Sequence, residues 1–198
     1  MADREVHVGR ARFGQWRPDR SGGPAGCAQA RYGSFLGQGP AQIDRMVRLN
    51  VTAVAGLPRA FPSCPVWPPA AGGRWSPLAG SAAYQPTPAM AVYGAAKAFV
   101  LSLTEAVVYE TRSSPLRVLA VFPGPAGTEF FDVVGSRGAA VGRLGTAGQV
   151  VDAACRALER GTTPPSVVAG LGSRVFATAS RLAPRRLAPA VAGRALKA

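Results

Sequence analysis

Tyr93 and Lys97 are the two residues whose types and spacing could carry out proton-transfer chemistry. They lie four positions apart in the segment YGAAK, and on a helix this spacing brings both side chains to one face. A free phenol has a pKa of about 10, which is too high for efficient proton transfer at neutral pH. A cation held nearby favours the phenolate, more strongly where the dielectric is low. The pair suits a general acid/base acting on a carbonyl or hydroxyl oxygen, although an ordinary amphipathic helix also shows this spacing by chance.

The residues around this pair predict the secondary-structure elements that must position it. Residues 90–111 form the longest helix candidate, and an apolar face is expected at Phe99, Leu103, Ala106 and Val107. Residues 117–122, RVLAVF, form a short apolar run closed by a Pro-Gly pair, which suits a buried parallel strand. A helix that feeds such a strand predicts layered α/β architecture.

Further elements are expected on either side. An apolar stripe of Ile43, Met46, Val47, Asn50 and Val51 predicts a helix within residues 40–61. Thr146 as the N-cap and Gly161 just past the end bound a helix over 146–160, and residues 166–170 could form a last strand.

Residues 82–130 carry a family resemblance. The run AAYQPTPAMAVYGAAKAFVLSLTEAVVYE, followed by VLAVFPGPAGTEF, closely resembles the short-chain dehydrogenase/reductase family, and within it the carbonyl-reductase-like members. The resemblance covers residues 32–61 and 80–185. It implies a Rossmann-type, doubly wound parallel sheet and NAD(P)H as cofactor. It also implies hydride transfer between the nicotinamide and a small-molecule carbonyl or alcohol substrate.

The resemblance also assigns roles to individual residues. Tyr93 matches the family's acid/base tyrosine, and Lys97 matches the lysine that lowers its pKa and holds the nicotinamide ribose. Asn50 matches the asparagine that anchors a relay water; the alternative is a helix residue bonded to a neighbouring backbone group. The positions that match the loop beside the nicotinamide and its phosphate are Pro123, Gly124 and Thr128, for which a plain strand-to-loop turn is the alternative.

The chain departs from the family pattern in three places. Gly80 stands where the family has the serine that positions the substrate oxygen, so Ser81 next to it becomes the candidate for that role. Pro77 lies in what should be a central parallel strand, where it removes a backbone donor. The two βαβ units that carry the glycine-rich dinucleotide loop are missing, so we expect only a partial Rossmann-type sheet.

One glycine pattern resembles the missing loop. Gly33, Gly37 and Gly39 fit the G-x-x-x-G-x-G spacing, but the residues ahead of them lack the apolar run of a buried strand. We therefore interpret this spacing as a coincidence.

The domain organisation is expected to be uneven. We expect residues 1–31 to be irregular and residues 32–198 to form an incomplete domain of the family, disrupted at 62–79 and ending in a basic tail at 180–198. The segments expected to be irregular or disrupted are rich in Arg, Pro and Gly, with five prolines from Pro62 to Pro77. As a hypothesis, residues 1–31 and about 62–79 are out-of-frame translation of an intact reductase gene. Sequencing the coding DNA tests this, because one clean reading frame for all 198 residues would count heavily against it.

Composition excludes several classes of protein. Apolar residues make up 47% of the 198 positions and charged residues 17%, unlike a charge-dominated disordered chain. No apolar run reaches the ~18 residues of a spanning helix, and no secretion signal is visible, so we expect a cytoplasmic location. Cys27, Cys64 and Cys155 are odd in number and far apart, which predicts neither a disulfide framework nor a metal site.

The net charge of +13 comes from 21 Arg and two Lys against 10 acidic residues. The arginines follow no recognition pattern, so specific nucleic-acid binding is not expected. Residues 160–198 carry seven basic and no acidic side chains, which allows a weak peripheral contact with membranes. Two alternatives to an enzyme remain open: an inactive relic that binds partners or forms homo-oligomers through the 90–111 helix, and a basic protein associated with membranes or nucleic acid.

Overall fold

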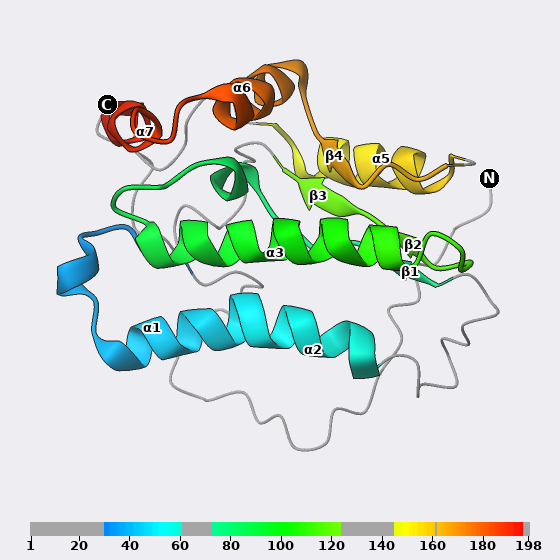
Figure 1. Ribbon diagram of the computed structural model, residues 1–198, viewed down its shortest axis with the longest axis horizontal. Coiled ribbons are helices and arrows are strands. Elements are labelled where there is room, and N and C mark those ends of the chain that lie inside the picture. Colours follow the sequence, from blue (N-terminus) through cyan, green and yellow to red (C-terminus); the bar gives the residue numbers. More distant parts are fainter. Residues whose placement is uncertain (1–29, 61–72, 124–144, 161, 196–198) are drawn as a thin grey trace.

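A parallel sheet of three short segments lies at the centre of the fold, and residues 117–122 form its middle strand (Figure 1). The computed structural model describes residues 30–60, 73–123, 145–160 and 162–195. Its strands are β1 (Arg74–Trp75), β2 (Arg117–Val118), β3 (Ala120–Phe122) and β4 (Ser166–Val168). Its α-helices are α1 (Pro40–Val47), α2 (Ala53–Ala60), α3 (Ala91–Glu110), α5 (Ala147–Leu158), α6 (Leu171–Leu182) and α7 (Ala188–Ala195).

Backbone hydrogen bonds join the three segments into one ladder. On one side of the middle strand, the amide groups of Arg117, Leu119 and Val121 donate to the carbonyls of residues 73, 75 and 77 over 2.8–3.0 Å. On the other side, β3 pairs in parallel with β4. The prediction of a buried parallel strand at 117–122 is confirmed, because residues 118–122 are all at most 3% exposed.

Pro77 interrupts the ladder without ending it. Its carbonyl accepts from the Val121 amide at 3.0 Å, and the Ala79 amide donates to the Val121 carbonyl at 3.0 Å. The register leaves the Leu119 carbonyl facing Pro77, which has no N–H to donate. The strand therefore continues from residue 73 to 79 with one rung missing. Residues 61–72, which make up most of the remaining segment expected to be disrupted, lie outside the described part of the chain.

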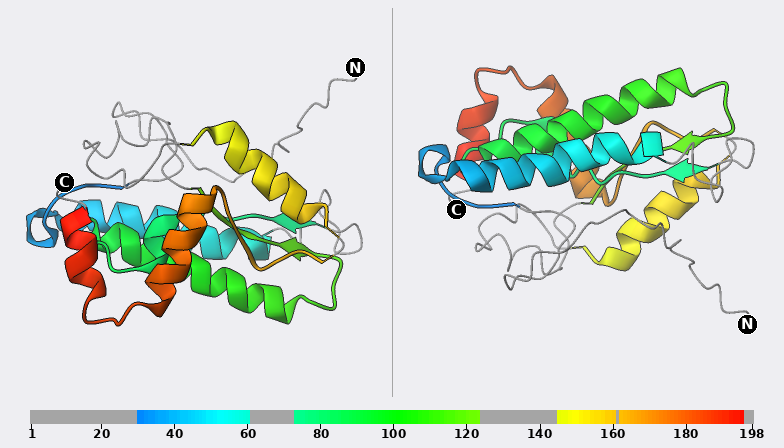
Figure 2. Two further views of the ribbon diagram at one scale, coloured as in Figure 1. Left: turned by 90° about the horizontal axis from the view of Figure 1, so that it is seen from above. Right: turned by 90° about the horizontal axis from the view of Figure 1, so that it is seen from below.

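Helices cover both faces of this sheet (Figure 2). Leu119 and Val121 point to one face, where they pack with Ala157 and Leu158 of α5. The alternate residues Ala120 and Phe122 point to the other face and pack with residues of α3. This period of two is the pattern of a strand buried on both sides. The fold is thus a partial, doubly wound α/β sandwich, as predicted.

Helix α3 crosses the sheet and lies beside α1 and α2 (Figure 1). The predicted helix over 90–111 is confirmed, but its predicted apolar face is wrong. Phe99 and Ala106 are exposed, whereas Ala96, Val100 and Leu101 are buried. The helix is apolar almost all round, so its sequence does not single out one face. Within the described residues it is the one helix long and apolar enough to cross a membrane, and here it packs against the sheet.

The described residues after 144 contain one predicted helix and two that the sequence did not reveal. Thr146 caps α5 through a capping box with Gln149, as its position predicted. In contrast, α6 has no counterpart among the expected elements, and α7 lies within the expected basic tail, 180–198. Pro184 follows the end of α6, and Pro189 occupies the second position of α7, where proline is tolerated. The prolines therefore separate two helices instead of preventing them.

Candidate functional site

The start of α3 brings Tyr93 and Lys97 to the end of the strand formed by residues 73–79. The loop before the helix is held close to it, because Gly94 lies directly against Thr87. A Cβ atom built on Gly94 would lie 2.9 Å from the Cβ of Thr87, too close for any real contact. Because Gly94 has no side chain, the loop can approach α3 closely. This contact positions the first turn of the helix, which carries Tyr93.

A Gly94→Ala variant should lose about 1–3 kcal/mol of unfolding free energy, because the added methyl group forces the loop away from α3. The matched control is Gly148→Ala in α5, where the nearest atom lies 3.9 Å from the added Cβ. That variant should gain up to about 1 kcal/mol from better helix propensity. Urea denaturation of both variants checks the pair, and a neutral Gly94→Ala would contradict the close approach.

Lys97 is anchored to the strand end by its ammonium group. Its Nζ donates a hydrogen bond of 2.9 Å to the carbonyl of Leu78, and it lies 5.4 Å from the centroid of the Tyr93 ring. The side chain is only 5% exposed. Both predicted residues therefore lie together on one face of α3, with the cation beside the ring and bonded to the backbone of the strand.

Position 80 is the one that faces the phenol. Gly80 has φ +80° and ψ 162°, and a Cβ atom there would lie 4.0 Å from the Tyr93 hydroxyl oxygen. This backbone conformation is essentially restricted to glycine. Ser81 begins the next 3₁₀ turn, Ser81–Tyr84. The place that faces Tyr93 thus carries a residue without a hydroxyl group, and the neighbouring serine does not occupy it.

Burial controls the ionisation of both groups. Desolvation raises the pKa of Tyr93 above its ordinary value, and desolvation lowers the pKa of Lys97 to about 8. From the sequence we expected the cation to lower the pKa of the phenol. In this structure burial outweighs that effect, because the low dielectric disfavours the charged form of each group.

Lys97→Met should raise the unfolding free energy by about 2 kcal/mol at neutral pH, since it removes a buried charge at the cost of one hydrogen bond. Between pH 8 and 10.5 the unfolded chain binds more protons at Lys97 than the folded chain does. The parent chain therefore becomes more stable relative to the variant as pH rises through this window. Urea denaturation at several pH values checks the trend; an advantage of the variant that grows with pH would contradict it.

Asn50 lies at the centre of a π-helical turn, Arg48–Thr52, which joins α1 to α2 and packs against α3. Its side chain is 2% exposed, and its Nδ2 donates to the Met46 carbonyl at 3.0 Å. Single π turns inside helices often occur at functional sites. From the sequence, Asn50 either anchors a relay water or bonds to a neighbouring backbone group. The bond to the Met46 carbonyl is of the second kind.

Of the remaining residues predicted to lie beside the cofactor, the structure describes only some. Pro123 directly follows β3 and is partly buried, whereas Gly124 and Thr128 lie outside the described residues. The glycine-rich spacing at Gly33, Gly37 and Gly39 precedes α1, but residues 30–34 form no strand. A Cβ atom on any of the three glycines would meet nothing within 4 Å. Within the described residues, these three glycines therefore form no strand-to-helix cradle for the diphosphate of a dinucleotide.

A contact of Tyr93 that the sequence did not reveal comes from residues 30–33. Ala30 and Met90 form a small buried cluster with Tyr32 and Tyr93 packed against it. The Gly33 amide fixes this segment by donating to the Ala89 carbonyl at 2.8 Å. Nothing in the local sequence of this irregular segment signals that it lies against the start of α3.

Comparison with known proteins agrees with this fold. The family model for short chain dehydrogenases matches residues 24–137, which is more than half of the chain. A short-chain dehydrogenase from Burkholderia cenocepacia J2315 in complex with NADP is 26% identical, with a TM-score of 0.66 over 85% of this chain and 67% of that one. A short-chain dehydrogenase from Sphingobium yanoikuyae in complex with NADPH is 27% identical, with a TM-score of 0.59 over 76% of this chain and 58% of that one.

A third solved structure has lower sequence identity and supports only a similarity of fold. This short-chain dehydrogenase from Streptomyces avermitilis is 20% identical, with a TM-score of 0.64 over 76% of this chain and 61% of that one. The chain thus spans between 58% and 67% of the length of these three proteins. No curated protein sequence matches it. The family match, the partial α/β sandwich and the Tyr93–Lys97 pair on α3 together show that the chain belongs to the short-chain dehydrogenase family.

Proposed function

We propose that this chain carries the proton-transfer part of an NAD(P)H-dependent oxidoreductase that interconverts a carbonyl compound and an alcohol. The observation that supports this proposal is the position of Tyr93 and Lys97 at the carboxyl end of a parallel strand. In open α/β sheets this edge is where ligands bind. The relatives solved with NADP and NADPH support the choice of cofactor class.

Each residue has a defined task in this proposal. Tyr93 donates a proton from its hydroxyl group to the substrate carbonyl oxygen and removes that proton in the reverse direction. Its raised pKa keeps it protonated at neutral pH, which suits the direction of carbonyl reduction. Lys97 would hold the ribose hydroxyls while its Nζ stays anchored to the Leu78 carbonyl. When bound, the nicotinamide supplies the hydride.

The purified chain should oxidise NADPH or NADH in the presence of a member of a panel of aldehydes and ketones. The loss of reduced-cofactor absorbance measures this, and a cofactor-dependent rise in the unfolding temperature measures binding separately. If the Tyr93→Phe variant kept the turnover of the parent chain, Tyr93 would have no part in the mechanism.

A second function is favoured by one specific observation. Gly80 offers no hydroxyl group towards Tyr93 at the position where the family's serine supplies a second hydrogen-bond donor to the substrate carbonyl. This favours a catalytically inactive module that binds a partner or a second copy through α3. Absence of turnover together with absence of a cofactor-dependent thermal shift would select this alternative, and light scattering would show whether α3 mediates self-association.

A further inference from the structure

The segment formed by α6 and α7 exposes several large apolar side chains on the outside of the molecule. In α6, Ala177 is 6% exposed and Phe176 is partly buried. Val175 and Leu182, which are seven residues apart and so share a helix face, are 71% and 80% exposed. A helix that only covers a core would carry polar residues at these two exposed positions.

Helix α7 and the residue before it also expose apolar side chains. Ala188 and Ala192, one turn apart, are 8% and 1% exposed, whereas Leu187 and Val191 are 59% and 61% exposed. Both helices lie along one side of the molecule, and in the view from above they lie nearest the viewer (Figures 1 and 2). We name the four exposed residues Val175, Leu182, Leu187 and Val191 the outer apolar face.

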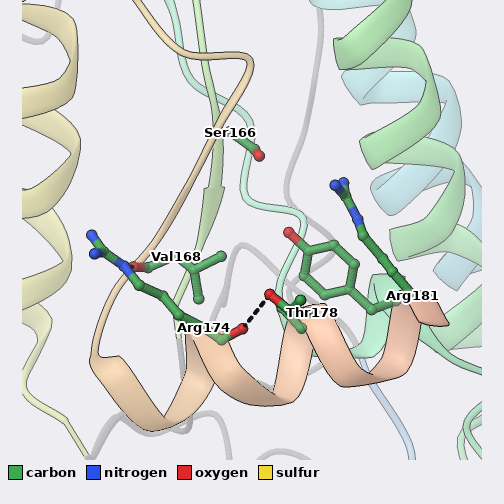
Figure 3. Close-up of a pocket in the computed structure, with 7 residues that line it drawn as sticks. Ser166, Val168, Arg174, Thr178 and Arg181 are labelled. Carbon is green, nitrogen blue, oxygen red and sulfur yellow. Dashed lines mark hydrogen bonds between the residues drawn. The ribbon is translucent and has the colours of Figure 1, made fainter. Parts of the chain in front are cut away.

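The orientation of α6 is fixed by contacts on its inner side. Arg174 Nε donates to the Val168 carbonyl at 3.2 Å, and Arg181 forms an ion pair of 2.8 Å with Glu105 of α3. A hollow of about 250 Å³ lies between α6 and β4, and Arg174, Arg181, Ser166 and Thr178 are among the residues that line it. Figure 3 shows these four side chains. Rotation of α6 to bury Val175 and Leu182 would break these contacts, so the outward direction of the apolar side chains is a property of the fold.

Charge indicates what covers this face. Arg185, Arg186 and Arg194 are exposed within the same two-helix segment, and the sequence contains no acidic residue after Glu159. A second copy of the chain would place like charges opposite one another, at a net charge of +13 per copy. A nucleic acid would leave the leucines and valines without an apolar partner. An anionic bilayer provides both complements, namely acyl chains for the apolar residues and phosphate groups for the arginines.

We propose that the α6–α7 segment docks on the surface of an anionic lipid bilayer, with the outer apolar face in contact with the acyl chains and Arg185 and Arg186 in contact with lipid phosphates. This surface is separate from Tyr93 and Lys97, so the proposal does not depend on catalytic activity. The long side chains of arginine can extend from an apolar surface to the headgroup level. The chain would lie on the membrane without crossing it.

Vesicle flotation tests this proposal with the full chain. The chain should float with vesicles of phosphatidylcholine and phosphatidylglycerol, bind vesicles of phosphatidylcholine alone at least roughly tenfold more weakly, and lose affinity as salt is added. Arg185→Gln combined with Arg186→Gln should weaken binding to the anionic vesicles about twenty-fivefold, at roughly fivefold for each arginine. Leu182→Asn combined with Val191→Asn should weaken it by at least roughly tenfold.

The matched control is Leu36→Asn, which makes the same substitution at a residue that is 91% exposed elsewhere on the molecule. It should leave flotation unchanged. All of these side chains are exposed, so circular dichroism and unfolding midpoints should match the parent chain. Equal binding to neutral and anionic vesicles, or binding that neither double variant weakens, would overturn the proposal. A change from dimer to monomer in the Leu182→Asn/Val191→Asn variant, measured by light scattering, would assign the face to a second copy instead.

Discussion

A Tyr93→Phe variant is expected to lose carbonyl turnover by roughly 10²–10⁴-fold, the usual contribution of a positioned general acid. The substitution removes one oxygen atom and keeps the ring that packs with Met90 and Ala30. The unfolding midpoint should therefore stay close to that of the parent chain. Steady-state oxidation of NADPH with the best substrate of the carbonyl panel measures the first effect, and urea denaturation measures the second.

The matched control for this prediction lies on the same helix. Tyr109 is 67% exposed near the end of α3, so Tyr109→Phe should change neither turnover nor stability. A loss of turnover that appears equally in both variants would indicate a nonspecific effect on α3. A loss in Tyr93→Phe that comes with a lower unfolding midpoint would indicate a structural role for the hydroxyl group.

Phe122→Ala should produce the largest loss of stability, about 3–5 kcal/mol of unfolding free energy. Phe122 is fully buried in the middle strand, and its ring stacks on that of Tyr84 with centroids 4.6 Å apart. Truncation would leave a cavity between the sheet and α3, which the rigid strand cannot close. Urea denaturation followed by circular dichroism measures the loss.

Two further variants keep this prediction testable if Phe122→Ala does not fold. Phe122→Leu keeps most of the volume and should cost less than about 1.5 kcal/mol. Val151→Ala removes apolar atoms from a side chain that is 59% exposed, so its effect should stay within about 0.5 kcal/mol. A cost for Phe122→Leu that is no greater than that of Val151→Ala would show that the strand is not the centre of the core.

The sequence predicted those parts of the fold that local pattern controls. The apolar run at 117–122 allows few alternatives, because six successive mostly apolar residues before a Pro-Gly pair fit only a short buried element. The capping box at Thr146 is likewise a local signal and located the start of α5 correctly. Tyr93 and Lys97 share one face because four-residue spacing is a property of any helix.

Features that depend on distant contacts could not be predicted in this way. The anchoring of Lys97 involves a carbonyl 19 positions earlier, and the face that α3 buries depends on where the sheet lies. The raised pKa of Tyr93 follows from burial, which no spacing reveals. Helices α6 and α7 were not predicted: α6 carries no strong boundary signal, and Pro189 lies in the first turn of α7, a place that the sequence alone does not reveal.

The bond between Lys97 and the Leu78 carbonyl has a consequence for self-association of the sheet. The register of the ladder turns this carbonyl away from the middle strand, towards an edge that no other described strand occupies. An exposed edge of this kind is a template for pairing with another molecule, and lysine is a residue that natural proteins use to prevent it. The Lys97 ammonium occupies the Leu78 carbonyl, so this acceptor is not free to pair with the strand of another molecule. The Lys97→Met chain, although more resistant to urea, should form edge-to-edge assemblies that light scattering detects at lower concentration than for the parent.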